Sequence, residues 1–314
     1  MPAVFLTGAT GCVGHYLIDA LSPDYDLYLL VRDPARLRFD PAARGNIRVI
    51  RGDMERTQEQ ADVLKKVDFC IHAATSWGGK SAARVNIERA HALFSLAAQA
   101  GVKRTIYFST ASILGRGNRP LQEARRYGTD YIRTKYDCYA DLSSIPRAER
   151  IITVFPTLIF GGDARHPYSH LSRSLPMLRR HAGWLGRLRS DLQFHFIHAR
   201  DIARLVRRLL ETDNPKREYV LGNQPLTLGQ FTREAAGFFG HRINWQIPLP
   251  VKAAMVLAPL LGGEVSPWDR FQLEYGSFLY ETINCPMFGL PDDLFTIRDI
   301  LADWERNALE VKRP

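Results

Sequence analysis

The chain has 314 residues, a formal net charge of +9, 46% hydrophobic residues and 24% charged residues. This length and composition are typical of a globular protein with a full core and exclude a disordered or fibrous chain. No apolar run reaches the ~18 residues that a membrane-spanning helix needs. The longest candidate, residues 253–261, is too short and contains Pro259. We therefore expect no transmembrane span.

The N-terminus predicts a dinucleotide site. Residues 3–6 form a short apolar run, typical of a buried parallel strand, and helical periodicity begins at residues 16–21. Between them, Gly8 permits a tight turn, Gly11 lets backbone amides approach phosphates, and Gly14 lets the helix pack closely on the strand. A pyrophosphate would then lie at the helix N-terminus, which favours anions. The expected contacts are Thr7, Gly8, Thr10, Gly11, Cys12, Val13 and Gly14.

The end of the second predicted strand, residues 26–31, bears on cofactor choice. An NAD enzyme usually has an acidic residue there to accept from the ribose 2′-hydroxyl. This chain has Arg32, which suits the 2′-phosphate of NADP, and Arg36 could be a second clamp. Asp33 could instead reach the ribose or turn outward as a helix cap. We predict NADP, with NAD less favoured.

The next two strands add further candidate contacts. Residues 47–50 lead to an acidic side chain that could accept from the adenine amino group or cap a helix. Residues 67–71 lead to small residues suited to close cofactor approach. The histidine at this second position is expected to pack and hydrogen-bond rather than carry a proton. These candidates are Asp53, Met54, His72, Ala73 and Ala74.

The predicted strand over residues 102–108 ends in the hydroxyls of Ser109, Thr110 and Ser112. Ligands bind at the carboxyl ends of strands in open α/β sheets. Such a hydroxyl could orient a substrate oxygen and stabilise the charge that develops on it.

A phenol and an ammonium follow, on one face of a helix predicted over residues 127–142. Tyr131 and Lys135 are one helical turn apart. Tyrosine has a pKa near ~10, and a cation within a few ångströms lowers such a pKa by about 1–3 units. We expect Lys135 to lower the pKa of Tyr131 and to hydrogen-bond the nicotinamide ribose. With Thr110 or Ser109, this predicts hydride transfer between a carbonyl and an alcohol, with Tyr131 as acid and base.

The chain resembles the short-chain dehydrogenase/reductase family, of the extended or atypical type that is similar to NAD(P)-dependent epimerases and dehydratases. The motifs that carry the resemblance are residues 7–14, 52–54, 72–74, 108–115, 155–161, 198–203 and 290–304. The resemblance implies that Thr110, ahead of Ser109 and Ser112, is the catalytic hydroxyl. It also implies that Asn86, at a helix bend, assists proton relay.

The same resemblance implies that residues 155–157 border the nicotinamide. Phe155, before Pro156, stands where the family commonly has arginine. Thr157 stands where many nucleotide-sugar enzymes have an asparagine that binds the sugar nucleotide. Both departures weaken a nucleotide-sugar assignment and leave the oxidoreductase chemistry untouched.

The expected fold is a Rossmann-type, doubly wound parallel α/β sheet with a smaller C-terminal substrate-binding lobe. Residues 1–160 would form the dinucleotide-binding domain, with residues 190–212 returning to the sheet. Residues 161–189 and 213–314 would form mainly the lobe. Phe271, Tyr275 and Phe278 recur at helical spacing, which indicates packing. Trp77 lies near the expected substrate entry, and the aromatic-rich lobe favours an apolar or aromatic substrate.

Charge and cysteines give weaker indications. Residues 165–189 are dense in arginine and histidine, which indicates a solvated surface or, alternatively, attraction of an anionic substrate, an acidic partner or an anionic membrane. No nucleic-acid module accompanies the basic residues, so nucleic acid is not an expected partner. The four cysteines have no paired spacing and no metal site is expected. Oxidation of Cys12 could block cofactor binding.

We expect a cytoplasmic protein without a leader, because the first strand begins at Ala3, and a homodimer is possible. Two alternatives to the oxidoreductase stay open. One is a nucleotide-sugar epimerase or dehydratase that retains its cofactor. The other is a non-catalytic NADPH-binding regulatory or assembly protein, which the presence of Thr110, Tyr131 and Lys135 makes the least favoured.

Overall fold

The fold is described from a computed structural model, over residues 1–213, 215–249 and 266–310. The apolar run at residues 253–261 lies outside these residues. Within them, no helix combines the length and the apolar character that crossing a membrane requires.

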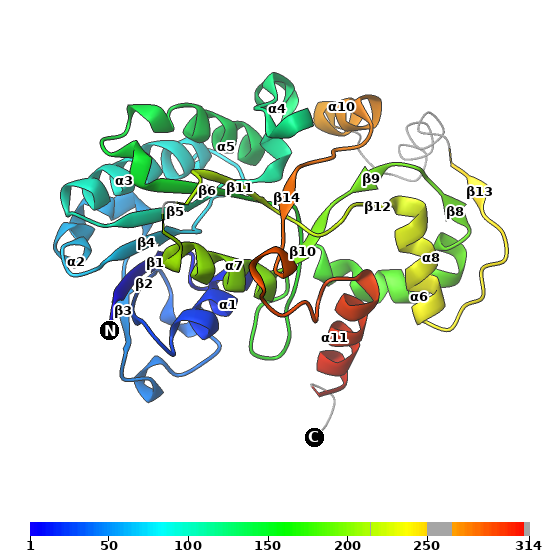
Figure 1. Cartoon of the computed structure of the whole chain (residues 1–314), viewed down its shortest axis with the longest axis horizontal. Coiled ribbons are helices and arrows are strands. Elements are labelled where there is room, and N and C mark those ends of the chain that lie inside the picture. The colour runs from blue at the N-terminus through cyan, green and yellow to red at the C-terminus, as the bar shows by residue number, and fades with distance from the viewer. Residues whose placement is uncertain (214, 250–265, 311–314) are drawn as a thin grey trace.

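The centre of the molecule is an eight-stranded sheet in the order β14-β11-β6-β5-β4-β1-β2-β3 (Figure 1). Every pairing within it is parallel. This confirms the Rossmann-type prediction. The strands are β1 Ala3–Thr7, β2 Asp26–Val31, β3 Ile47–Arg51, β4 Phe69–His72, β5 Arg104–Phe108, β6 Ile151–Pro156, β11 Glu218–Leu221 and β14 Thr282–Ile283.

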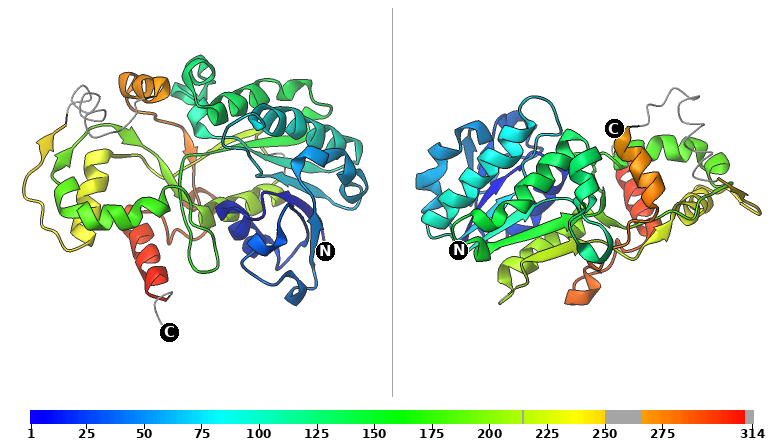
Figure 2. Two further views of the ribbon diagram at one scale, coloured as in Figure 1. Left: turned by 180° about the vertical axis from the view of Figure 1, so that it is seen from behind. Right: turned by 90° about the horizontal axis from the view of Figure 1, so that it is seen from above.

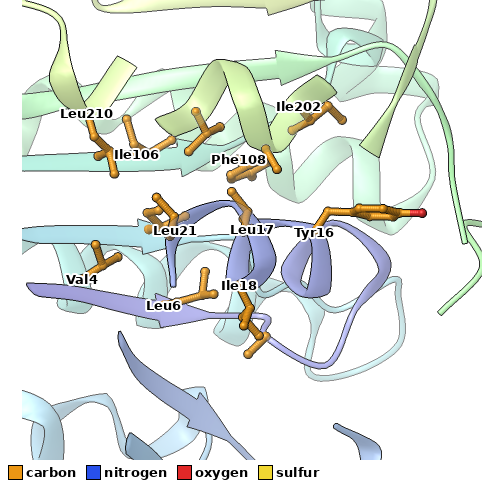
Figure 3. Close-up of a cluster of buried hydrophobic side chains, with 14 of the residues drawn as sticks. Val4, Leu6, Tyr16, Leu17, Ile18, Leu21, Ile106, Phe108, Ile202 and Leu210 are labelled. Atoms are coloured by element: carbon orange, nitrogen blue, oxygen red, sulfur yellow. The ribbon is translucent and has the colours of Figure 1, made fainter. Parts of the chain in front are cut away.

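Both faces of this sheet are covered, which explains the continuous apolar run of β1. Val4 and Leu6 pack toward α1 (Cys12–Leu21) and α7 (Ala199–Glu211), a core drawn in Figure 3. Ala3 and Phe5 point to the opposite face, where α2 (Ala61–Leu64) and α3 (Ala90–Gln99) lie. Side chains alternate along a strand, so a strand buried on both faces needs apolar residues at every position.

The predicted helix over residues 127–142 corresponds to α5 (Asp130–Ala140), and a separate short helix, α4 (Gln122–Tyr127), precedes it. At Gly128, any Cβ would lie 2.2 Å from the Ala124 carbonyl oxygen, so the residue that ends α4 has to be glycine. The hydroxyl of Thr129 then accepts from the Ile132 amide (3.4 Å) and caps α5. The predicted helix is therefore present but begins at Asp130, because the Thr129 cap fixes its start.

The C-terminal lobe carries α6 (Leu175–Leu185), α8 (Leu228–Phe238) and α11 (Ile297–Glu310), seen from behind in Figure 2. Its short strands pair in twos: β7 (Leu158–Phe160) with β10 (Phe196–His198), β8 (Leu188–Arg189) with β13 (Ile247–Pro248), and β9 (Gln193–Phe194) with β12 (Leu226–Thr227). Two strands from the predicted lobe segments, β11 and β14, instead extend the central sheet. They have four and two residues, too few to show a period.

The aromatic residues of α10 (Pro267–Tyr275) form a packed cluster. Phe271 and Tyr275 have ring centroids 5.4 Å apart, and Tyr275 and Phe278 are 4.8 Å apart. Phe271 and Phe278 pack against a core that contains Ile132 and Phe155. The predicted packing role of these residues is confirmed.

Candidate active site

The glycine loop after β1 is as tight as its sequence predicts. Gly8 has φ +80°, and a Cβ there would lie 2.6 Å from the Ala73 carbonyl carbon. A Cβ on Gly14 would lie 2.2 Å from the Gly8 carbonyl oxygen, a distance that no side chain allows. Gly11 is exposed, with only the Gly8 oxygen near its Cβ position, at 3.4 Å.

The N-terminus of α1 suits a pyrophosphate. Its N-cap is Gly11, which provides no capping side chain, and the first turn contains no acidic residue. The first amides of a helix lack partners within the helix, and together with the dipole they favour an anion. Thr10 and Cys12 flank Gly11. An N-terminus with unpaired amides and no acidic side chain fits the pyrophosphate of a dinucleotide.

Thr7 and His72 connect the ends of β1 and β4. The Thr7 hydroxyl lies 2.8 Å from His72 Nδ1 and accepts from the Ala74 amide at 3.2 Å. Burial lowers the pKa of His72 to about 3, and the charge of Lys135 adds to this effect. His72 is therefore neutral near pH 7, as expected of a packing residue. Thr7 holds the segment after β4, because its carbonyl accepts from the Ala73 amide and its hydroxyl from the Ala74 amide.

At the end of β2, Asp33 is a helix cap whose carboxylate accepts from the Ala35 amide at 3.1 Å. Arg32 and Arg36 are exposed, and neither side chain has a hydrogen bond or ion pair within the described part of the chain. Asp53 likewise caps the next turn by accepting from the Glu55 amide at 2.9 Å. Met54 is buried in the core beside Leu30, so its side chain packs there.

Lys135 is buried behind the expected hydroxyl cluster. Its Nζ donates to the Phe108 carbonyl oxygen at 2.7 Å and lies 4.9 Å from the centre of the Tyr107 ring. Burial lowers the pKa of Lys135 to about 8. An ammonium has three donors, so one bond to Phe108 leaves two for other acceptors.

The pKa of Tyr131 moves in the direction opposite to the prediction. Burial raises it to about 12, and the neighbouring Thr110 side chain lowers it only in part. The Lys135 ammonium instead donates to the Phe108 carbonyl. The sequence spacing placed the two residues on one face but could not show where the ammonium points.

Thr110 and Ser109 have different surroundings. Thr110 caps a short turn: its Oγ1 accepts from the Ser112 amide and donates to the Ser112 hydroxyl, both at 3.3 Å. It lies beside Tyr131. The Ser109 hydroxyl is buried and has no hydrogen-bond partner among the residues the structure describes. Of the two hydroxyls, the one that affects the pKa of Tyr131 is that of Thr110, which favours Thr110 over Ser109.

Asn86 lies in a π-type turn, residues 84–89, that leads into α3. Its carboxamide oxygen accepts from the Ser76 amide (2.8 Å) and the Thr75 hydroxyl (3.1 Å). Its nitrogen donates to the Ser76 carbonyl (2.8 Å) and the Thr134 hydroxyl (2.9 Å). The side chain thus holds the loop after β4 and contacts neither Tyr131 nor Lys135 through a hydrogen bond.

The candidates at the end of β6, Phe155, Pro156 and Thr157, contribute mainly to structure. The Phe155 ring is buried and packs edge-on against Tyr139, with centroids 5.2 Å apart. The Thr157 hydroxyl donates to the Leu221 carbonyl at 3.0 Å, and Pro156 pairs with Leu221 in the sheet. Any cofactor contact from Phe155 would therefore come from its backbone.

Cys12 lies in the predicted loop but is a poorly reactive thiol. Burial, with a further contribution from Asp163, raises its pKa to about 12. Thiolate is the form that oxidises readily. The structure therefore does not favour the predicted redox role. Val13, beside it, packs against the core under α1.

The side chains of His15 and Arg38, near the cofactor loop, were not identified from the sequence. His15 contacts the Gly11 carbonyl through Nδ1 (3.0 Å), and its Nε2 accepts from the Arg38 amide (3.1 Å). The Arg38 guanidinium donates to the carbonyls of Asp163 (2.9 Å) and His166 (3.1 Å). The contacts of Arg38 join segments far apart in the chain, so no local motif could have revealed them.

Within the described residues, no group of histidine, cysteine and acidic side chains is arranged to hold a metal ion.

The sequence and the structure are similar to one group of known proteins. The profile of the NAD dependent epimerase/dehydratase family matches residues 4–222. Among solved structures, gox2253 has a TM-score of 0.73 at 22% identity, covering 99% of both chains. The UDP-glucose 4-epimerase from Bifidobacterium longum, in complex with NAD+ and UDP, has a TM-score of 0.69 at 15% identity, covering 98% of both. MoeE5, in complex with UDP-glucuronic acid and NAD, has a TM-score of 0.66 at 20% identity, covering 98% of this chain and 100% of MoeE5.

At these identities the structures share the fold and carry no assignment of substrate. No curated protein matches the chain significantly. The fold and the glycine loop define a Rossmann-type α/β protein. The chain belongs to the NAD-dependent epimerase/dehydratase family.

Proposed function

We propose that this protein is an NADP(H)-dependent oxidoreductase that interconverts a carbonyl and an alcohol on a small apolar or aromatic molecule. The observation that carries the proposal is the meeting of α5 with the carboxyl end of β5. Buried Lys135, one helical turn after Tyr131, donates to the carbonyl of Phe108, the last residue of β5, which Ser109 and Thr110 follow directly. A phenol and a hydroxyl brought to one place can serve one substrate oxygen.

Each residue has a task that follows from its surroundings. A bound nicotinamide dinucleotide would supply or accept the hydride. The Tyr131 hydroxyl would give its proton to the substrate oxygen, or take it back in the reverse direction. Thr110 would donate a hydrogen bond to the same oxygen. Lys135, with two donors left beyond its bond to Phe108, would hydrogen-bond the ribose.

The preference for NADP rests on the end of β2. Asp33 uses its carboxylate to cap Ala35, which reduces its value as an acceptor for a ribose hydroxyl. Arg32 and Arg36 are exposed and could both reach a 2′-phosphate. The family is named for NAD, and several similar structures contain NAD. The proposed preference for NADP therefore rests on Arg32 and Arg36 and not on the family.

A second candidate is a nucleotide-sugar epimerase or dehydratase that retains its cofactor. The family match favours it, as do complexes such as the epimerase with NAD+ and UDP. Against it, Phe155 lies in the core and Thr157 is bonded to Leu221, at the positions where the sequence departs from nucleotide-sugar enzymes. A non-catalytic NADPH-binding protein is less favoured, because Thr110, Tyr131 and Lys135 are all present.

The experiment is Tyr131→Phe, with Tyr139→Phe as matched control. Tyr139 is on the same helix, and its hydroxyl donates to Glu218 at 2.7 Å, outside the site. With NADPH and a panel of aldehydes and ketones, Tyr131→Phe should lower turnover by about 10²- to 10⁴-fold. Binding of NADPH, followed by its fluorescence, should stay unchanged in both variants. Full activity of Tyr131→Phe would refute the proposal, and cofactor that co-purifies without net consumption would favour the epimerase.

A further inference from the structure

An indole covers one face of the Tyr131 ring. The rings of Trp77 and Tyr131 are stacked, with centroids 4.5 Å apart and planes 29° apart. His170 meets Trp77 edge-on at 4.6 Å. The three residues come from the loop after β4, from α5 and from the segment after β7, so only the tertiary structure brings them together.

The loop that carries Trp77 is tied on both sides of the indole. Before it, Asn86 bonds both the amide and the carbonyl of Ser76, each at 2.8 Å. After it, the Gly79 amide donates to the Asp130 carboxylate at 3.2 Å. Asn86 is 1% exposed and all its polar atoms are paired, so it is a firm anchor. Asp130 directly precedes Tyr131, which fixes the indole relative to the phenol.

Trp77 nevertheless remains 60% exposed. Single exposed apolar residues are common on protein surfaces and need no special cause. This one differs because its backbone is anchored on both sides and its ring stacks on the phenol of the proposed site. A flat π surface held in this place can stack on a second ring, and aromatic pairs contribute beyond the area they bury.

We infer that Trp77 is the specificity-determining residue of the substrate site and selects a carbonyl or alcohol attached to an aromatic or conjugated ring. His170 borders the same place, and Asn86 and Asp130 position the indole. The inference rests on the proposed function, because it takes Tyr131 as the group that serves the substrate oxygen.

The test compares two probes that differ in the ring, benzaldehyde and cyclohexanecarbaldehyde, with NADPH. The ratio of their kcat/KM values is measured for the native protein, Trp77→Phe and Trp77→Leu. Aromatic pairing of ~0.5–1.5 kcal/mol corresponds to about 2- to 12-fold, so Trp77→Leu should lower the ratio by that factor. Trp77→Phe keeps a ring and should retain most of the preference. Trp245→Leu removes an indole that is similarly exposed but lies in the C-terminal lobe, and should change nothing.

Binding without turnover gives a second readout. Benzyl alcohol and cyclohexylmethanol are titrated without cofactor, and the tryptophan fluorescence is followed. The aromatic alcohol should bind the native protein and Trp77→Phe more tightly than Trp77→Leu, and the aliphatic alcohol should not distinguish them. Thermal melts of each variant establish that it folds.

The outcomes separate the two proposals. Turnover with an unchanged ring preference in Trp77→Leu would overturn the inference alone. Ring-selective binding lost in Trp77→Leu, with no turnover of any carbonyl, would support the aromatic site and refute the proposed function. Equal binding of both alcohols to all variants would overturn the inference whatever the activity.

Discussion

At the scale of single residues, the balance between burial and hydrogen bonding sets the pKa of each buried histidine. His72 and His198 are both buried, and burial lowers the pKa of each to about 3. His166 is also buried, but its pKa is raised. Burial acts to lower it, and hydrogen bonds with Asp163 (2.8 Å) and Asp19 (3.0 Å) outweigh that effect. His166, between two carboxylates, is thus the exception, because its surroundings favour the charged form.

This cluster joins α1 to the segment after β7. The Tyr16 ring stacks on His166 at 3.8 Å, and the His15 ring meets His166 edge-on at 6.5 Å. Arg44 pairs with Asp19 at 3.1 Å. Arg38 binds the carbonyls of the same segment, which continues to His170 beside Trp77. In Figure 3 the Tyr16 oxygen points away from the apolar core.

We predict that His166→Gln lowers the free energy of unfolding by about 3 kcal/mol at pH 6, because two carboxylates lose a buried cationic partner. The folded-state pKa of His166 is raised, so its contribution is complete below the unfolded value of about 6.5 and is lost as pH rises through the folded pKa. Urea denaturation at pH 6 and pH 9 measures this. The difference between native protein and variant should shrink at pH 9, and an equal difference at both pH values would contradict the assignment.

At the scale of elements, the glycine loop and α1 act as one unit. Gly14 belongs to the first turn of α1. It lies so close to the Gly8 carbonyl oxygen that no Cβ would fit between them. Gly8 in turn approaches the backbone of Ala73, so β1, the loop, α1 and the end of β4 are mutually fixed. Gly11, the N-cap of α1, stays exposed in this arrangement.

We predict that Gly14→Ala disrupts this unit. Its Cβ would lie 2.2 Å from the Gly8 oxygen, so the helix must shift, and overpacking of this kind costs about 1–3 kcal/mol or more. Nucleotide binding should weaken with it. Gly237→Ala is the matched control: Gly237 lies in α8 with open space around its Cβ position, and alanine there should stabilise by about 0.5–1 kcal/mol. Thermal melts and NADPH titrations distinguish the two, and an unaffected Gly14→Ala would refute the close packing.

At the scale of the whole molecule, the proposed cofactor would contact two neighbouring turns of the Rossmann part: the glycine loop after β1 and the turn after β2, strands that lie side by side in the sheet (Figure 1). A ligand that binds only the folded state stabilises it by about 2.7 kcal/mol at 100 times its Kd. Thermal stability therefore reports cofactor choice without any knowledge of the substrate.

We predict that NADPH raises the melting temperature more than NADH at equal concentration. Arg32→Ala should remove this difference and weaken NADPH binding by about tenfold or more, the value of a hydrogen bond to a charged group. Arg298→Ala, an exposed arginine on α11, should leave it unchanged. A larger shift with NADH in the native protein would instead assign NAD, in line with the family description.

The sequence determined the fold class, the parallel strands β1 to β6 and the glycine loop, because these depend on local spacing: continuous apolar runs and glycines where a Cβ cannot fit. It also placed Tyr131 and Lys135 on one helix. The tertiary structure alone decided the rest. Asn86 anchors the Trp77 loop, the Lys135 ammonium turns to Phe108, Phe155 enters the core, and His166 lies between Asp19 and Asp163. Each of these depends on contacts between residues far apart in the chain, and the burial and orientation that such contacts create leave no local pattern.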